Sequence, residues 1–274
     1  MTKILCSVVV LAALVSCAEQ YTESYNIQGS SSVSVLDGSK LYLKVMKGQE
    51  LQSIDSCEVV HGGFGFIGQL DTTRIAMLSI RDGGMPLVIE KGDIKVTIDR
   101  TGHKVSGSPM NELLYDYMDK LLQLTNQRAE LGHKEAQMML NGVDERTIAT
   151  VLSEEDGRLM MQIDSLETHF ILDNLNNVLG PCAFQMLTAG FNYPVLTPQI
   201  EEIMSKATDK FKNDPYVKDY VEVARENQAR QTGMKDVAPQ TMTQPELPGD
   251  TTLQSPLQPQ IPLTNVPQSD ETSD

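Results

Sequence analysis

The hydrophobic pattern of this 274-residue chain changes its period once, at Ser108-Pro109. Before that point apolar and polar residues alternate, most clearly at residues 40–45 and 93–98, with the two-residue period of a half-buried β-strand. After it, apolar residues recur every three or four positions, for example over residues 113–124, as in an amphipathic helix. Because one segment cannot satisfy both periods, the chain must fold as a strand-rich part followed by a helical part.

The strand-rich part is predicted to be an antiparallel β-sandwich or open barrel over residues 25–107, which makes the fold class α+β. Short strand-like segments follow one another at regular spacing and are separated by turns that contain Gly and Asp, a pattern typical of sandwiches. The predicted strands are 25–29, 40–46, 49–60, 63–70, 74–80, 87–90, 93–99 and 103–106.

The helical part is predicted to span residues 108–232. Ser108 is the expected N-cap of its first helix, with Pro109 at the first helical position. Residues 138–140 either extend that helix or belong to a second one. Further helices are expected at about 145–175, ended by Gly180-Pro181, and at 197–213 and 215–231.

The N-terminus has the features of a bacterial lipoprotein signal. Lys3 precedes an apolar run over residues 4–15, which is too short for a membrane span, and Leu14-Val15-Ser16-Cys17 has the form of a lipobox. We predict a signal peptide at 1–16, acylation (palmitate included) at Cys17, and a tether at 17–24 that leads to the sandwich. The alternative is an ordinary signal peptide with an incidental cysteine.

An acylated Cys17 would anchor the protein to a membrane without a transmembrane helix. Ala18 follows this cysteine, where an inner-membrane lipoprotein would carry a retention Asp, so the expected location is the outer membrane. The sequence leaves open whether the protein faces the periplasm or the outside.

Two cysteines then remain as thiols, Cys57 and Cys182. They lie far apart in sequence and no C-x-x-C motif is present, so redox catalysis by this chain alone is not expected. The two residues either form one disulfide in an oxidising envelope or stay as unpaired, buried thiols that pack like small hydrophobes.

Charge and composition exclude some partners. The chain has 22 Lys and Arg against 37 Asp and Glu, a formal net charge of −15, which leaves little positive charge for nucleic acid. Residues 233–274 are rich in Pro, Gln and Thr and contain no aromatic residue, so this segment is predicted to be a disordered tail.

The remaining motifs indicate no catalytic centre. Residues 63–68 satisfy G-x-G-x-x-G, but a strand pattern follows instead of a helix, so we interpret them as half of a hairpin that pairs with residues 59–60. The four histidines are scattered and no Cys/His cluster has ligand spacing, so neither a metal nor a cofactor is predicted. The methionines of the helical part are interpreted as core residues, with a Met-rich groove for a peptide as the minor alternative.

An ordered series of short motifs carries a family resemblance. The motifs are Tyr25-x-Ile27-x-Gly29, Asp37-Gly38, Leu41-Tyr42-Leu43, Ser53-Ile54-Asp55-Ser56, Gly63-x-x-Phe66-x-Gly68, Leu87-Val88-Ile89-Glu90-x-Gly92-x-Ile94-x-Val96, Val105-x-Gly107-Ser108-x-x-Asn111, Asn174-x-x-Asn177-x-x-Gly180, Leu196-Thr197-Pro198 and Asn213-Asp214-Pro215-Tyr216-Val217. Over residues 25–230 the sequence resembles the uncharacterised N-terminal region of lipid-anchored thiol-disulfide oxidoreductases from the Bacteroidota. In such proteins a thioredoxin-like domain with a Trp-Cys-x-x-Cys site follows. Since this sequence contains neither Trp nor C-x-x-C, the redox activity and its functional residues are not carried over.

The sequence therefore predicts a non-catalytic envelope lipoprotein that acts as a binding or scaffolding module. Its expected partners are the membrane, through the lipid anchor, and a protein of the envelope. The alternative function is that of an accessory to thiol-disulfide exchange, in which Cys57 or Cys182 reacts with a separate thioredoxin-like partner. Capture of a sugar or peptide on the sandwich face is a third hypothesis, which rests on the fold alone.

Overall fold

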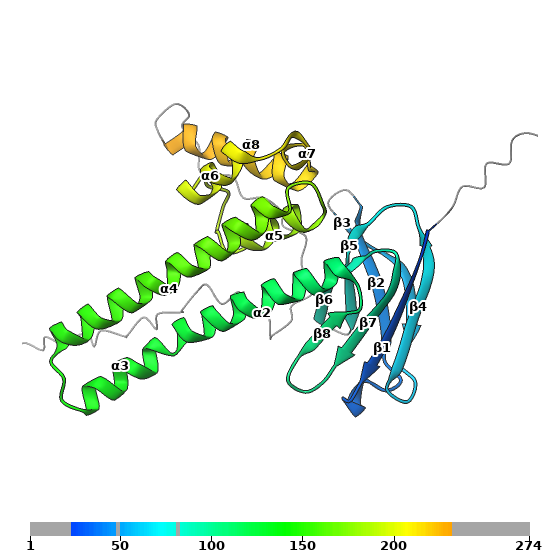
Figure 1. Ribbon diagram of the computed structural model, residues 1–274, viewed down its shortest axis with the longest axis horizontal. Coiled ribbons are helices and arrows are strands. Elements are labelled where there is room, and N and C mark those ends of the chain that lie inside the picture. Colours follow the sequence, from blue (N-terminus) through cyan, green and yellow to red (C-terminus); the bar gives the residue numbers. More distant parts are fainter. Residues whose placement is uncertain (1–22, 48–49, 81–82, 232–274) are drawn as a thin grey trace, which may run out of the picture.

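The structure is a computed structural model that describes residues 23–47, 50–80 and 83–231. The predicted signal peptide at 1–16, the lipidation site Cys17, most of the tether and the tail at 233–274 lie outside these residues. Figure 1 shows the strands gathered at one end of the molecule, a long helical hairpin leaving them, and the later helices lying beside that hairpin. No helix within the described ranges is long and apolar enough to cross a bilayer.

The strands form two four-stranded sheets, which confirms the predicted sandwich. Their order is β4-β1-β7-β8 in one sheet and β3-β2-β5-β6 in the other. The bounds are β1 Glu23–Ser31, β2 Lys40–Lys47, β3 Glu50–Glu58, β4 Gly63–Leu70, β5 Arg74–Ile80, β6 Gly83–Ile89, β7 Gly92–Ile98 and β8 His103–Ser106. The core between them contains fully buried Ile27, Leu43, Leu78, Leu87 and Ile94.

Two details of the predicted sandwich are wrong. The first strand begins at Glu23, inside the predicted tether. One strand pair is parallel, because β1 enters its sheet between β4 and β7 and runs alongside β7 from Tyr25 opposite Gly92. A parallel pair needs a long connection, and here the chain passes through the whole second sheet before β7 returns beside β1.

Of the hairpin predicted between residues 59–60 and the G-x-G-x-x-G segment, only the turn at His61-Gly62 is present. His61 and Gly62 have φ angles of 51° and 76°, as a type I′ turn requires, and Val60 and Gly63 exchange backbone hydrogen bonds at 2.8 and 2.9 Å. The following strand β4 does not continue the pairing but crosses to β1. The backbone N–H of Ser31 donates to the Gly62 carbonyl oxygen at 2.6 Å, which fixes the turn against the end of β1. The G-x-G-x-x-G segment is thus a strand, as predicted.

Aromatic rings cover glycines across the β1–β4 pair. Gly29 lies opposite Phe64 and Gly68 opposite Tyr25. A Cβ atom on Gly29 would lie 2.0 Å from the Phe64 ring, and one on Gly68 would lie 2.4 Å from the Tyr25 hydroxyl oxygen. These rings therefore rest directly on glycine backbone, which explains why the motifs contain glycine at these positions.

Replacing Gly29 by alanine is expected to lower the free energy of unfolding by about 1–3 kcal/mol, because the Phe64 ring must leave its place on β1. Urea unfolding of the two proteins measures this difference. Gly157→Ala is the matched control: a Cβ atom there meets nothing within 4 Å, so a helical alanine should stabilise by up to about 1 kcal/mol. An unchanged midpoint for Gly29→Ala would contradict the steric argument.

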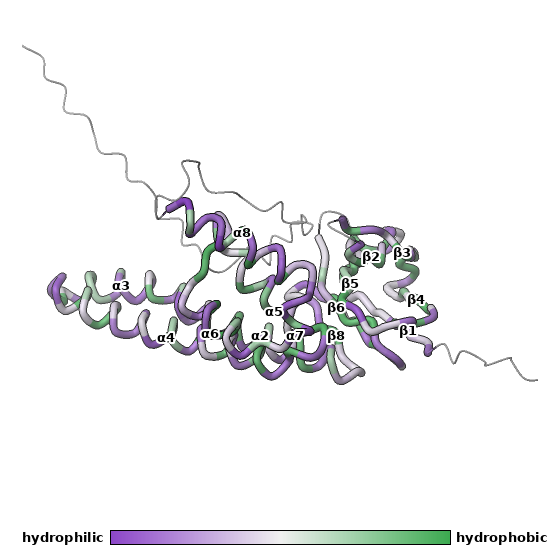
Figure 2. Tube along the Cα trace, turned by 90° about the horizontal axis from the view of Figure 1, so that it is seen from above, coloured by the Kyte–Doolittle hydropathy of each residue, from purple (hydrophilic) through white to green (hydrophobic). Residues whose placement is uncertain are grey.

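The helical part follows the predicted order with two corrections. Its helices are α2 Pro109–Ala129, α3 Leu131–Leu140, α4 Glu145–Asp173, α5 Leu179–Thr188, α6 Pro198–Lys206, α7 Asp209–Lys212 and α8 Pro215–Gln231. Residues 138–140 belong to a second helix, so that open alternative is decided. Figure 2 shows hydrophobic stretches around α5 and in the sheets, whereas α8 is hydrophilic toward its end.

The first correction concerns Gly180-Pro181, which lies in the first turn of α5 instead of ending α4. The Asn174-x-x-Asn177-x-x-Gly180 motif builds the corner between these helices. Asn177 Nδ2 donates to Asn174 Oδ1 at 2.8 Å, and Asn177 Oδ1 accepts from the Leu179 backbone N–H at 2.8 Å. A Cβ atom on Gly180 would lie 2.5 Å from the Asn174 carbonyl oxygen, and proline is tolerated in a first turn because N–H groups there lack helical partners.

The second correction is that the helix predicted over residues 197–213 is two helices. Ala207 is extended, with φ −66° and ψ 138°, and the Thr208 side chain caps α7 by accepting from the Phe211 backbone N–H at 3.4 Å. The break turns the fully buried Phe211 against Phe184, with ring centroids 5.7 Å apart. Burial of one large ring outweighs continuity of a short helix.

A buried polar joint connects the sandwich to α2. The predicted N-cap Ser108 has the right place and an extended backbone, but its side chain makes no capping hydrogen bond to the helix backbone. Glu90 caps the helix instead, since its Oε1 accepts from the backbone N–H groups of Met110 and Asn111 at 2.9 and 3.3 Å. The Asn111 side chain, fully buried, pairs with both backbone groups of Val88 at 2.8 Å.

Candidate functional site: an aromatic pocket between α5 and α8

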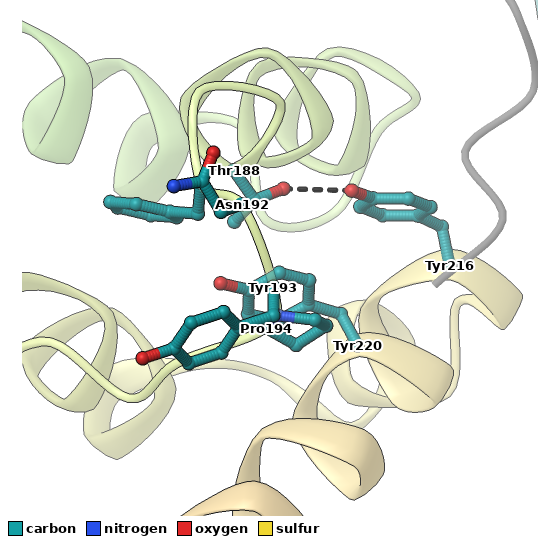
Figure 3. Close-up of a pocket in the computed structure, with 7 residues that line it drawn as sticks. Thr188, Asn192, Tyr193, Pro194, Tyr216 and Tyr220 are labelled. Atoms are coloured by element: carbon teal, nitrogen blue, oxygen red, sulfur yellow. Dashed lines mark hydrogen bonds between the residues drawn. The ribbon is translucent and has the colours of Figure 1, made fainter. Parts of the chain in front are cut away.

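A pocket of about 230 Å³ lies between the end of α5, the loop after it and α8. Figure 3 shows Tyr216 and Tyr220 extending from α8, with the hydroxyl of Tyr216 directed toward Thr188. Its lining consists of Thr188, Phe191, Asn192, Tyr193, Pro194, Tyr216 and Tyr220.

The start of α8 places the two tyrosines of that helix. Asp214 caps α8, because its Oδ1 accepts from the backbone N–H groups of Tyr216 and Val217 at 3.0 and 3.3 Å. Tyr216 and Tyr220 are four residues apart and therefore lie on one face of the helix. Asp214-Pro215, a local helix-start signal, thus aims this face at α5.

The aromatic wall of the pocket is held by ring packing and hydrogen bonds. The Phe184 ring packs edge-on against Tyr216 and Tyr220, with centroids 6.4 and 5.4 Å away. The Tyr216 hydroxyl is hydrogen-bonded to Thr188 Oγ1 at 2.8 Å. The Tyr220 hydroxyl accepts from the Val195 backbone N–H and donates to its carbonyl oxygen, both at 3.1 Å. Packed and hydrogen-bonded rings of this kind form a preorganised surface, which lowers the entropic cost of binding.

Tyr216 and Tyr220 remain neutral hydrogen-bonding groups at ordinary pH, because both of their pKa values are raised. Burial raises the pKa of Tyr220 to about 12, although its backbone hydrogen bond to Val195 lowers it. Burial also raises the pKa of Tyr216, against the lowering effect of the Thr188 hydrogen bond. None of the seven lining residues carries a carboxylate, an amine, a thiol or an imidazole. The polar groups of the lining are the hydroxyls of Thr188 and the three tyrosines and the amide of Asn192.

The size of the pocket restricts what it can hold. Sites for drug-sized ligands have volumes of about 300–1,000 Å³, whereas this one has about 230 Å³. It therefore suits one or two side chains of a peptide better than a whole cofactor. Asn192 is exposed at its edge and can donate to or accept from a peptide backbone.

A second hollow of about 530 Å³ lies on the hairpin between α2, α3 and α4. Its one cation, Arg128, is already held by both carboxylate oxygens of Asp156, at 2.5 and 3.4 Å. Methionine lines neither hollow, so the Met-rich groove considered from the sequence does not coincide with either of them. Met139 and Met161 are exposed on the hairpin helices instead.

The predicted thiols are free and lie in different parts of the fold. Cys57 is on β3 and Cys182 is on α5. Burial raises the pKa of Cys57, opposed by a hydrogen bond involving the Gly65 backbone and reinforced by the charge of Asp55. Burial raises the pKa of Cys182 to about 12. Both groups are therefore thiols, not thiolates, near neutral pH.

Sequence reasoning did not single out the pocket. In the sequence Tyr216 stood out only as part of a motif that carries the family resemblance, Asn213-Asp214-Pro215-Tyr216-Val217, and the loop residues carried no motif. One signal was present: six of the fourteen Tyr and Phe residues fall within a stretch of 37 positions, residues 184–220. They are Phe184, Phe191, Tyr193, Phe211, Tyr216 and Tyr220. Such a concentration in a chain poor in aromatic residues marks either a local core or a binding surface, and here it forms both.

Comparison with known proteins finds a similarity in the sandwich and in the joint between the sandwich and α2. A search of curated proteins and a search of solved structures each found no match. A family model matches a segment that begins within β1 and ends in the first turns of α2, so the matched segment includes Glu90 and Asn111. Residues 25–114 match the family model described as Domain of unknown function (DUF4369).

Proposed function

We propose that this protein is a non-catalytic, lipid-anchored module of the bacterial envelope that binds an extended peptide segment in the aromatic pocket of its helical part. The observation that carries the proposal is the pocket itself: preformed, uncharged, walled by packed tyrosines and sized for side chains. Rigid tyrosine surfaces supply large contact area at a low cost in conformational entropy.

The anchor and the family link are part of this proposal. The lipobox at residues 14–17 supports acylation of Cys17, and Ala18 supports the outer membrane. The match of residues 25–114 to a domain of unknown function supports a shared sandwich with the N-terminal region of lipid-anchored thiol-disulfide oxidoreductases of the Bacteroidota. In this protein the sandwich would serve as the base from which α2 and the helices carrying the pocket extend (Figure 1).

The state of the two thiols favours binding over thiol exchange. An exchange partner needs an accessible thiolate, which forms readily only where the pKa is lowered. The pKa values of Cys57 and Cys182 are both raised by burial. A module that acts through its pocket agrees with this chemistry better than an accessory that acts through sulfur.

Photocrosslinking in cells tests the proposal. Benzoylphenylalanine in place of Tyr193, at the pocket, is expected to capture a peptide segment in the membrane fraction. The same group in place of Tyr42, which is 38% exposed on β2, is the control and should capture none. The wild-type protein should incorporate radiolabelled palmitate, and Cys17→Ser should not. Absence of any crosslink from position 193 would contradict the proposed peptide site, and equal palmitate labelling of wild type and Cys17→Ser would contradict the proposed anchor.

A further inference from the structure

The chain leaves its last helix beside the pocket. Gln231 is the final residue of α8, and its Nε2 donates to the hydroxyl of Tyr193 at 3.3 Å. Tyr193 lines the pocket. The segment that follows Gln231 therefore starts at the edge of the site.

That segment contains a sequence repeat suited to an aromatic site. Prolines occupy positions 256, 259 and 262, and no Asp, Glu, Lys or Arg occurs from 251 to 269. Proline at every third position is the repeat of the polyproline II helix, in which such residues share one face. Aromatic-lined grooves are the sites that bind polyproline II segments.

We propose that the aromatic pocket takes up one or two proline side chains from residues 256–262 of the same chain, so that the protein carries its own pocket ligand. This inference rests on the proposed function of the pocket as a peptide site. The uncharged repeat matches the uncharged lining, so binding buries no charge on either side. Proline restricts the backbone φ angle before binding, so binding of the repeat costs less conformational entropy than binding of a proline-free segment.

The length of the link between α8 and the proline repeat suits binding of the repeat within the same chain. Residues 232–255 make a link of 24 residues, and a random-coil chain of that length has a root-mean-square span on the order of 30 Å. Such links give effective concentrations on the order of 1 mM. A site with a Kd on the order of 0.1 mM would then be about 90% occupied by the tail. A competing peptide would bind about tenfold more weakly than to an empty pocket.

Crosslinking from the tail tests the inference in the purified full chain. Benzoylphenylalanine in place of Gln260 is expected to crosslink to residues 188–194 or 216–220, identified by mass spectrometry. In a mixture of nitrogen-15-labelled and unlabelled protein, the two peptides of each crosslinked pair should be either both labelled or both unlabelled, because they come from one chain. The crosslink yield should stay constant over tenfold dilution. The control probe replaces Glu246, in the charged part of the tail, and should give at most one-fifth of that yield.

Substitutions in the repeat separate recognition from chance collision. The triple variant Pro256→Ala, Pro259→Ala, Pro262→Ala should lower the yield from position 260 at least fivefold. The matched control, Pro239→Ala with Pro267→Ala, removes prolines outside the repeat and should leave the yield unchanged. Equal yields from positions 246 and 260, or insensitivity to the triple variant, would overturn the inference. Mixed-label pairs that make up about half of the crosslinks in an equal mixture, the share that random pairing between copies gives, would overturn it in favour of a second copy's tail.

The two crosslinking experiments fail in different ways. If the probe at Tyr193 captures another protein and never the tail, the proposed peptide site stands and the self-ligand is wrong. If the probe at Tyr193 captures nothing and the probe at Gln260 captures nothing in the pocket, both proposals are wrong. If the two probes find each other's segments within one chain, both are supported.

Discussion

Replacing Asn111 by alanine is expected to lower the free energy of unfolding by about 3–5 kcal/mol. The Asn111 side chain is fully buried, accepts from the Val88 backbone N–H, and donates to the Val88 carbonyl oxygen and to Ser108 Oγ. Alanine leaves both backbone groups of Val88 without these partners, and each buried polar group so orphaned costs about 1–3 kcal/mol. The loss falls on the joint between the sandwich and α2, so the two parts should also unfold less cooperatively.

Urea unfolding followed separately by a sandwich probe and by helical circular dichroism measures both effects. Asn126→Ala is the matched control, because Asn126 is exposed on the same helix and its loss should change stability by less than about 0.5 kcal/mol. Asn111→Asp should also destabilise strongly, since it removes the amide donors and buries a carboxylate. A change for Asn111→Ala as small as that of the control would show that the joint does not stabilise the fold.

Replacing Glu167 by glutamine is expected to stabilise the protein by about 3 kcal/mol above pH 7. Glu167 is 3% exposed on α4, and burial raises its pKa from 4.5 to about 7, opposed by the hydrogen bond from Gln199 and reinforced by the charge of Asp164. The folded state therefore binds the Glu167 proton more tightly than the unfolded state does. Glutamine keeps an acceptor oxygen for Gln199 Nε2, which lies 3.3 Å from the carboxylate, and never ionises.

The sign of the pH dependence follows from the raised pKa. As pH rises from about 4.5 to about 7, the unfolded chain loses the Glu167 proton first, so the wild-type free energy of unfolding falls through this window and then levels off. The gain from Glu167→Gln should grow over the same window from near zero. Glu154→Gln, at an exposed position of the same helix, is the control and should show no such growth. A gain that is the same at pH 4 and pH 8 would contradict the assignment.

Local sequence signals were enough to place most elements. Strands β4, β5 and β8 and helix α8 have the residue bounds that alternation and helix-start signals predicted. These features depend on side chains within a few residues of one another, so a period or a cap identifies them. The same locality explains the errors: Thr208 is a weak cap inside a longer helical pattern, and the burial of Phe211 decided the break there.

Partners that are distant in the chain could not be predicted in this way. Alternation shows that β4 has one buried face, but not that β4 pairs with β1 instead of β3. Glu90 resembled the end of a strand, and only the approach of α2, about twenty residues later, makes its carboxylate a helix cap. The pocket likewise joins a loop and a helix that share no motif.

The sequence by itself determined the order of the two parts, the elements within them and the uncharged proline repeat beyond α8, because each is a property of neighbouring residues. Tertiary structure alone decided which strands pair, which carboxylate caps α2 and where the aromatic residues after Phe184 enclose a pocket. The physical reason is that these outcomes depend on which buried faces pack together. Hydrophobic periodicity indicates that a face is buried. Which other face packs against it depends on shape complementarity and hydrogen bonding across the whole fold.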